Sequence, residues 1–478
     1  MGRAGKSFRK GQERGWKPYH SIWLMLFLSW TLLYLDRSIT GPVVTWMISG
    51  DVAFMVGAPF PHALGGIIGS MFFAGYMLTQ FPAGYLGDRF GHRAVIVLSL
   101  LWSAMATMAS GLVRDLVAFV GTRVLTGLGE GAYYSNDRAV VCESTPRERR
   151  SLGMGVVFSG LALGMTLAFV LTPPILEAGA AWLGKEGAWS LPFLLFSAPT
   201  LLLGAWLWRA FKVRTRDVLQ VGKRMVPWSV VFLATLMAVY VVTIHFGLGQ
   251  VVQAAFVLLA ASALVLVIHR RLGGRGSAVM RDRNLLFLYL SAIPILYTLW
   301  FFGFWALMVV SEASALGLSG AAVYAALFGL ANGIGYPIGG RLGDRVGAPG
   351  RPRLYVALCL GVASAILVMA LLIGSDPEPF LLGGALFVTG VLFAASQTVH
   401  MTMAGDLAPP GERGQAFGMW NLVAEVGAVI APVLSGALRD LTGDWGPAII
   451  LDGLLLIASA IIVALFVRAG REGADWGS

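Results

Sequence analysis

Long apolar runs recur along the whole of this 478-residue chain and leave it few possible folds. About 20 apolar residues, at a rise of about 1.5 Å per residue, cross a hydrocarbon core of roughly 30 Å. A closed membrane barrel would instead show short segments of alternating polarity. Only 13% of the residues are charged, whereas a soluble domain carries about 25%. The chain is therefore predicted to be an all-α polytopic membrane protein.

The apolar runs fall into two sets of six, separated by charged or Pro/Gly-rich turns. The runs of the first set are 21–46, 62–87, 94–113, 117–142, 152–173 and 190–210, and those of the second set are 285–310, 317–341, 354–374, 380–404, 414–438 and 447–467. Two further runs, 226–246 and 251–269, lie between the sets. We predict fourteen transmembrane helices, arranged as an N-terminal six-helix bundle (1–216), an inserted two-helix hairpin with basic linkers (217–283) and a C-terminal six-helix bundle (284–478).

Arginine and lysine residues gather in the loops on one predicted side of the membrane, and the net charge is +10. The clusters lie at 89–93, 147–150, 212–224, 270–283, 351–353 and 413. Positively charged loops stay in the cytoplasm, so both termini are predicted to be cytoplasmic, in the plasma or inner membrane. The positive charge is expected to contact anionic lipid headgroups rather than nucleic acid.

A charged motif occurs at equivalent positions in the two sets. Gly84-Tyr-Leu-Gly-Asp88-Arg89-Phe-Gly-His-Arg93 follows the second run of the first set, and Gly340-Arg-Leu-Gly-Asp344-Arg345 follows the second run of the second set. A shorter motif also recurs, as Glu148-Arg149 and Glu412-Arg413, after the fourth run of each set. Parallel repeats of six helices are typical of transporters in which two bundles rock about a central site.

The longer motif resembles the signature of the major facilitator superfamily, and the resemblance covers nearly the whole chain outside 226–269. Tyr34-Leu-Asp36-Arg37, the segment 75–84 and Gly127-Leu-Gly-Glu130 further resemble the anion:cation symporters, which carry sugar acids, other organic carboxylates and phosphate. That group is expected to have an asparagine where Glu425 stands. Spinster-like lipid transporters, which have an Asp-Arg pair in the first helix and a Gly-Glu pair in the fourth, are a second resemblance.

The resemblance implies that the repeated motifs form charge locks at the cytoplasmic ends of the helices in the outward-facing state, and that they gate the transporter without binding substrate. The residues to which it assigns this role are Gly84, Asp88, Arg89, Arg93, Glu148, Arg149, Gly340, Asp344, Arg345, Glu412 and Arg413. The sequence has no nucleotide-binding loop, metal-ligand spacing or nucleophile motif. We therefore expect no enzyme activity, no cofactor and no metal.

Three carboxylates, those of Asp36, Glu130 and Glu425, are predicted to lie within roughly 4 Å of the midpoint of a span. An ionisable group at this depth is costly unless it is paired or faces water, so each is a functional candidate. Transporters of this kind bind their substrates near the membrane midplane. We predict that Glu130 and Asp36 carry a coupled proton.

The fourth run carries a row of charged residues. Arg123, Glu130 and Asp137 are seven residues apart, so they lie on one helix face, and Arg138 follows directly. A row of alternating charges suits a water-filled path, and we predict a charge network here. The alternative is that these side chains only neutralise partners on other helices.

Arg37 is predicted to bind an anion, because a guanidinium forks onto a carboxylate or phosphate and stays charged. Asp36 would then pair with Arg37 or take part in proton coupling. A purely structural bridge, from Asp36 to Arg123 or from Arg37 to Glu130, is the alternative. Glu425 could take a cationic group of the substrate or a second proton. The residues predicted to bind substrate are Arg37, Tyr34, Tyr76, Tyr297, Trp305, Gln397, Asn421 and Glu425.

The leading hypothesis is a secondary active transporter that works by alternating access, as a proton-coupled symporter of an organic anion such as a sugar acid. The first alternative is a spinster-type transporter of lysolipids or amphipathic molecules, with a lateral entrance shaped by 226–269. The second is a substrate sensor or scaffold without turnover. The expected partners are a small-molecule substrate, protons and membrane lipid, and we expect a monomer.

Overall fold

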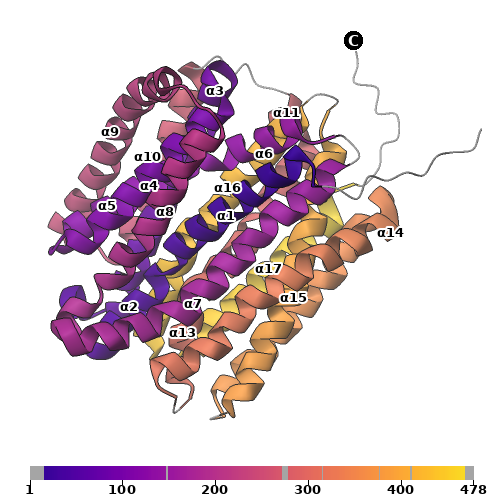
Figure 1. Ribbon diagram of the computed structural model, residues 1–478. Coiled ribbons are helices and arrows are strands. Elements are labelled where there is room, and N and C mark those ends of the chain that lie inside the picture. Colours follow the sequence, from indigo (N-terminus) through magenta and orange to yellow (C-terminus); the bar gives the residue numbers. More distant parts are fainter. Residues whose placement is uncertain are drawn as a thin grey trace, which may run out of the picture.

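The computed structural model describes residues 16–146, 149–271, 278–314, 316–375, 377–409 and 412–468. Apart from turns, these residues form α-helices and one 3-10 helix, η1 (Ala53–Met55), so the predicted all-α class is confirmed for them. Twelve helical segments of the described chain are long and apolar enough to cross a membrane. Figure 1 shows them running side by side as long rods.

The helices of the N-terminal half follow the predicted runs closely. They are α1 (Pro18–Ser38), α2 (Thr40–Gly50), α3 (Pro61–Phe90), α4 (His92–Leu112), α5 (Leu116–Gly131), α6 (Tyr133–Ser144), α7 (Arg150–Ala188) and α8 (Leu191–Ala210). α7 continues beyond the predicted end at 173, because Pro173 and Pro174 lie inside the helix, and its backbone is broken only at Gly184 (φ 72°). Membrane helices tolerate proline where neighbouring groups satisfy the freed carbonyls.

The rest of the chain is also helical. Its helices are α9 (Thr215–His245), α10 (Gln250–Arg271), α11 (Ala278–Arg281), α12 (Arg283–Ser291), α13 (Ile293–Glu312), α14 (Leu318–Ile373), α15 (Pro379–Leu407), α16 (Arg413–Thr442) and α17 (Gly446–Phe466). α9 begins before the predicted run, at Thr215, because the basic linker continues the helix. α14 contains two predicted runs, with a non-helical backbone at Gly347 (φ 66°) between them.

The count of fourteen spans and the three-part division remain predictions. α5 has only 16 residues, fewer than the roughly 20 that a span needs, and neither α5 nor α6 is among the twelve segments. The 56 residues of α14 count as one segment, although they include a break at Gly347.

The same pairing order of helices occurs in both halves. In the N-terminal half, α1 packs against α7, α3 against α5, and α4 against α8. In the C-terminal half, α13 packs against α16, and α14 packs against both α15 and α17. The sequence repeat is thus matched by a repeat in three dimensions, which is the arrangement that parallel repeats produce.

The two halves meet along three helix pairs, α2 with α13, α3 with α16, and α7 with α14. The backbones come very close where the start of α3 meets the second half of α16, since a Cβ added at Gly66 would lie 2.4 Å from the carbonyl oxygen of Pro432. We call the end of the molecule that carries the repeated motifs, 84–93 and 340–345, the basic end. The other end, at which α3 and α16 touch, is called the opposite end.

α9 and α10 form a hairpin beside the N-terminal half, at the far side of the molecule from α14 and α15 (Figure 1). α9 packs against α3, α4 and α5, whereas α10 packs against α3 and also against α16 of the other half. The outward side chains of α10, such as those of Phe256 and Leu259, are exposed. α10 therefore covers the seam between α3 and α16.

Candidate functional site

Arg37 and Glu130 form a buried ion pair between α1 and α5. Nε and Nη2 of Arg37 donate to Oε2 of Glu130 at 2.9 and 2.6 Å, and the two side chains are 3% and 0% exposed. α5 reaches this position because it packs on the backbone of α3: a Cβ at Gly131 would lie 2.1 Å from the carbonyl oxygen of Tyr76. The structural alternative, a bridge from Arg37 to Glu130, is the contact observed. Pairing neutralises two charges that would be costly in hydrocarbon.

Aromatic rings from both halves surround the guanidinium of Arg37. Its Cζ lies 4.5 Å from the ring centre of Tyr34 and 4.6 Å from that of Tyr76. Three more rings, at 5.5 to 5.8 Å, are those of Phe72, Trp30 and Trp300. Because Trp300 belongs to α13, the second half of the chain reaches Arg37 through this ring. Cation–π attraction adds to the ion pair in holding the guanidinium.

Asp36 points away from its neighbour Arg37, as adjacent residues on a helix must. Its Oδ2 accepts a hydrogen bond from the hydroxyl of Thr107 in α4, while its Oδ1 has no hydrogen-bond partner among the described residues. Arg123 is also fully buried and donates to the hydroxyls of Ser110 and Thr126 at 3.0 and 2.8 Å. Asp36 and Arg123 thus belong to a second polar cluster, inside the N-terminal half.

Asp137 and Arg138 lie one helix further along, in α6. Asp137 accepts from Nε1 of Trp30 at 2.7 Å and from Nη1 of Arg138 at 3.1 Å, and the Arg138 guanidinium lies 3.5 Å from the ring centre of Tyr134. Asp137, like Arg123 and Glu130, is 0% exposed. The predicted row of charges is therefore packed against neighbouring helices in this conformation and does not line a water-exposed surface.

Glu425 lies in a polar group that joins the two halves. Nδ2 of Asn421 donates to Oε1 of Glu425 at 3.2 Å and to Oε1 of Gln80, in α3, at 3.0 Å. Glu425 is 4% exposed, and the side chain of Gln80 also hydrogen-bonds toward its carboxylate. Asn421, Glu425 and Gln80 thus form one buried group of amides and a carboxylate between α16 and α3.

The remaining predicted substrate residues form hydrogen bonds within the C-terminal half. The Tyr297 hydroxyl lies 2.8 Å from the hydroxyl of Ser435, Trp305 donates to the carbonyl of Pro432 at 2.9 Å, and Gln397 accepts from Tyr336 at 3.1 Å. Tyr297 and Trp305 are buried. These residues pack helices together and do not contact Arg37.

The first gating motif is exposed at the basic end. The Asp88 side chain is 78% exposed and lies 3.3 Å from His92, one turn along the chain, and Arg89 lies 3.5 Å from the hydroxyl of Tyr85. Arg93 lies over the ring of Phe211 at 5.4 Å. These are contacts within the N-terminal half, and no ion pair recorded for the described residues joins Asp88 to α16.

The second motif behaves in the same way. Asp344 is 84% exposed and lies 3.8 Å from Arg351. Arg149 precedes α7, and Glu412 precedes α16, which begins with Arg413; Glu148 lies outside the described residues. The space beside Gly84 contains Ser135, and that beside Gly340 contains no atom within 4 Å. The predicted charge locks are therefore not formed in this conformation.

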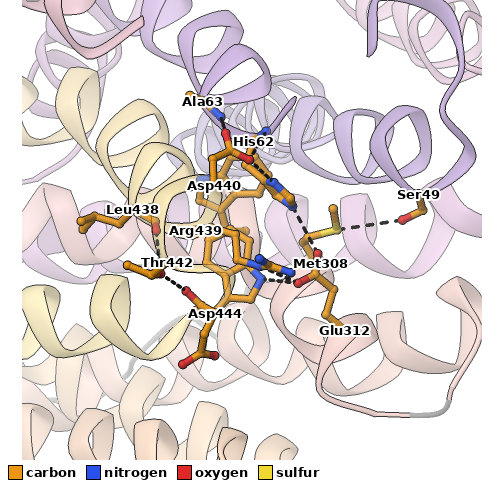
Figure 2. Close-up of polar contacts among 12 residues, drawn as sticks. Ser49, His62, Ala63, Met308, Glu312, Leu438, Arg439, Asp440, Thr442 and Asp444 are labelled. Carbon is orange, nitrogen blue, oxygen red and sulfur yellow. Dashed lines mark hydrogen bonds and ion pairs between the residues drawn. The ribbon is translucent and has the colours of Figure 1, made fainter. Parts of the chain in front are cut away.

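Sequence reasoning missed a polar cluster at the opposite end (Figure 2). It consists of His62, Glu312, Arg439, Asp440 and Trp445, which come from the ends of three helices and the turn before a fourth. Charged residues at helix ends are ordinarily solvated, which is why the sequence did not single them out. A signal was present, since Arg439 is a cation on the side where positive charge is otherwise scarce.

A sequence model of the Major Facilitator Superfamily matches residues 26–326 and 295–476. The chain belongs to this superfamily. Its members and the relatives below are transporters, not enzymes, so the prediction of a membrane transporter is confirmed.

Named relatives of this superfamily member carry anions. A probable chloroplastic anion transporter of Arabidopsis thaliana is 34% identical over 25% of this chain and 24% of its own length. The probable sulfoacetate transporter of Cupriavidus necator is 24% identical over 95% of this chain and 94% of its own. The D-galactonate transporter of Escherichia coli is 24% identical over 93% and 94%. The first match thus spans about a quarter of that relative, and the other two span almost the whole of each.

Solved structures share the fold of this superfamily member. The xylose transporter of E. coli in its inward-open conformation has a TM-score of 0.68, at 16% identity over 95% of this chain and 97% of its own. A bacterial homologue of the lysosomal transporter spinster, in an inward-facing conformation, has a TM-score of 0.63, at 16% identity over 95% and 96%. The predicted resemblance to spinster-like transporters is thus confirmed at the level of the fold, and the predicted resemblance to the anion:cation symporters is supported by the relatives above.

Proposed function

We propose that this protein is a proton-coupled symporter of an organic anion, and that the buried pair of Arg37 and Glu130 is its coupling site. The proposal rests on one observation: the ion-pair partner of Arg37 is the buried carboxylate of Glu130, and this pair lies near the contact between the two halves. The names of the relatives, which include transporters of sulfoacetate and D-galactonate, support an anionic substrate.

Charge balance accounts for the coupling. When the site is empty, Arg37 and Glu130 neutralise each other. A substrate carboxylate that replaces Glu130 on Arg37 leaves the Glu130 charge buried without a partner, which is strongly destabilising. A proton on Glu130 removes that charge, so the anion and the proton bind together. Both the empty and the doubly occupied site are then neutral and can pass through the closed intermediate of alternating access.

Asp36 takes a supporting part in this proposal. Its carboxylate is held by Thr107 and has one oxygen without a hydrogen-bond partner among the described residues. When Glu130 has lost its proton, a proton held by Asp36 can pass to it, and the Asp36 carboxylate left behind is then balanced by the charge of Arg123. Asp137 and Arg138 fix α6 against α1 and serve a structural role.

Glu425, Asn421 and Gln80 supply the contacts for the rest of the substrate. A carboxylate acceptor and amide groups suit hydroxyl groups of a substrate, which both donate and accept. Trp300 and Tyr34 offer apolar faces beside them. A hydroxylated carboxylate such as a sugar acid fits this set of groups, with its carboxylate on Arg37.

We propose fourteen spans, with the basic end and both termini in the cytoplasm. Residues 116–144 make a fourth span from α5 and α6 together, and the break at Gly347 divides α14 into two spans. The hairpin α9–α10 adds two more. Contact between the halves at the opposite end and the exposed Asp88 and Asp344 at the basic end support an inward-facing state.

The spinster-type alternative depends on lateral access for a lipid. α10 packs against both α3 and α16 and covers the seam between them, which disfavours a lateral opening on that side. The second alternative, a sensor or scaffold, needs no buried proton-coupling pair. Both are less well supported than anion symport.

Uptake into proteoliposomes tests the proposal. The probes are D-galactonate, sulfoacetate and a lysolipid, each with and without an inward proton gradient. Concentrative uptake of a carboxylate that requires the gradient is the expected result. Gradient-independent movement of the lysolipid alone would favour the spinster-type function, and binding without movement would favour a sensor.

A further inference from the structure

The cluster at the opposite end places one histidine between two carboxylates. Nδ1 of His62 lies 2.6 Å from Oδ1 of Asp440, and Nε2 lies 3.2 Å from Oε1 of Glu312. Figure 2 shows the ring of His62 bridging these two acids. The side chains of His62 and Asp440 are 9% and 4% exposed, whereas that of Glu312 is 28% exposed. The imidazole of His62 is thus largely shielded from water, and its partner Glu312 is partly exposed to water.

The two carboxylates are held by further donors. Oε2 of Glu312 accepts from Nε of Arg439 at 2.8 Å and from Nε1 of Trp445 at 3.0 Å. Asp440 accepts from the backbone N–H groups of His62 at 3.3 Å and Ala63 at 2.7 Å. These N–H groups belong to the first turn of α3. The N–H groups of a first turn have no acceptor within the helix, and the positive end of the helix dipole favours an anion there. Both acids are therefore fixed as acceptors toward His62.

The cluster joins the two halves of the transporter. His62 belongs to α3 of the N-terminal half, and its partners Asp440 and Glu312 belong to α16 and α13 of the C-terminal half. The backbones also touch, because a Cβ at Gly436 would lie 2.3 Å from the carbonyl oxygen of His62. The contacts can form only while α3 and α16 are together at this end.

Hydrogen bonding decides the protonation of the ring. A neutral imidazole has one N–H, and its second nitrogen is an acceptor, whereas an imidazolium donates from both nitrogens. Each nitrogen of His62 faces a carboxyl oxygen, so with both acids ionised the imidazolium is the form that satisfies both contacts. The charges then balance: His62 and Arg439 are positive, and Asp440 and Glu312 are negative. The rings of Trp305 and Trp445, whose centres lie 6.0 and 5.7 Å from that of His62, pack around the imidazole.

We propose that His62, Asp440 and Glu312 form a second proton-binding site, distinct from Glu130, that is complete only when the opposite end is closed. A ligand that binds one of two states shifts the equilibrium toward that state. A proton on His62 therefore stabilises the closed arrangement, and opening this end releases His62 from both acids. With this end facing outward, as proposed above, an acidic exterior favours closure.

The test measures the distance across this end as a function of pH, without any substrate. Val56 and Leu441 are 60% and 73% exposed and lie beside the ends of α3 and α16. The Val56→Cys/Leu441→Cys variant, with Cys142→Ser and Cys359→Ala, carries a spin label at each position in lipid nanodiscs. Pulsed electron–electron spectroscopy between about pH 8 and about pH 5.5 spans the range in which histidine titrates.

We expect the short-distance population to grow as the pH falls, with a closed-to-open ratio that rises by at most about 10-fold per pH unit, the limit for one linked proton. His62→Gln should remove this dependence, and Asp440→Asn should weaken it while keeping an acceptor for the N–H groups of α3. His245→Gln is the matched control, because His245 is exposed at the end of α9 and should leave the response unchanged.

An unchanged distance distribution across this pH range, or the parental response in His62→Gln, would overturn the proposal. Size-exclusion profiles show whether each variant is folded, and Asp440→Asn provides an independent variant if His62→Gln is not. The measurement needs no transport. Failure of organic anion uptake would therefore count against the proposed function and leave this inference standing.

Discussion

At the scale of single residues, the protein concentrates its buried charge in pairs and small clusters. Arg37 has Glu130 as its ion-pair partner, and Asp36 accepts from Thr107 instead of pairing with its neighbour Arg37. A buried ion pair adds little to the free energy of unfolding, whereas removal of one of its members lowers that free energy strongly. Each pair is therefore a place where a proton or a substrate can replace an existing partner.

Glu130→Gln is expected to abolish accumulation driven by a proton gradient while substrate exchange persists. The amide resembles a permanently protonated carboxyl, so Arg37 stays free to bind the anion but the proton cycle stops. The measurement compares gradient-driven uptake with counterflow in proteoliposomes. Full accumulation with an unchanged pH dependence would mean that Glu130 has only a structural role.

Arg37→Ala is expected to weaken substrate binding by about 2–5 kcal/mol, because one member of a desolvated charge pair is removed. Arg37→Lys should recover only part of this, since an ammonium cannot reproduce the two-pronged contact. Binding is followed by a thermal-shift titration with D-galactonate. The double variant Arg37→Ala/Glu130→Ala is the control, and rescue of transport in it would argue against anion binding at Arg37.

At the scale of helices, close backbone contact at the opposite end depends on small side chains. Gly66 lets α3 lie against Pro432 of α16, where a Cβ would overlap the carbonyl oxygen. Overpacking of such a contact costs about 1–3 kcal/mol. Since this contact exists only in the closed arrangement, the cost falls on one conformational state.

Gly66→Val is therefore expected to shift the molecule toward an open opposite end and to slow transport. The readout is the spin-label distance between positions 56 and 441, which should lengthen. Gly155→Val is the matched control: Gly155 also lies within a membrane helix, and a Cβ there would meet no atom within 4 Å. Equal changes of this distance in the two variants would show that valine in a membrane helix causes the change, and not the overlap with Pro432.

At the scale of the whole molecule, the proposed fourteen-span topology rests on the hairpin α9–α10. In that topology the hairpin is a pair of spans that returns the chain to the side that it left, so that both halves have the same orientation. α10 also touches a helix from each half, which makes the hairpin a brace beside the moving parts.

A cysteine at the tip of the hairpin, Gly249→Cys, is expected to react with an impermeant maleimide from the outside of intact cells. Gly249 is exposed, with no atom within 4 Å of an added Cβ. Arg216→Cys, at the exposed start of α9, is the control and should react only after the membrane is opened. Labelling of position 249 from the cytoplasmic side alone would exclude the fourteen-span arrangement.

The sequence by itself determined the helical membrane class, the internal repeat and the superfamily, because apolar length and the spacing of motifs are properties of the chain alone. It also located Arg37, Glu130 and Glu425, since a charge within an apolar run is visible without a structure. It did not determine their partners. Whether Arg37 meets Glu130 or Asp36 depends on helix rotation and on contacts such as that of Gly131 with α3.

Only the tertiary structure assembled His62, Glu312, Asp440 and Arg439 into one cluster. They come from three segments that are more than 100 positions apart, and they stand near helix ends, where single charges are normally solvated. Tertiary packing likewise occupied Tyr297 and Trp305 with helix contacts and left Asp88 and Asp344 exposed. Such outcomes depend on which ends of the two halves touch, and that is a property of the conformation rather than of any local segment.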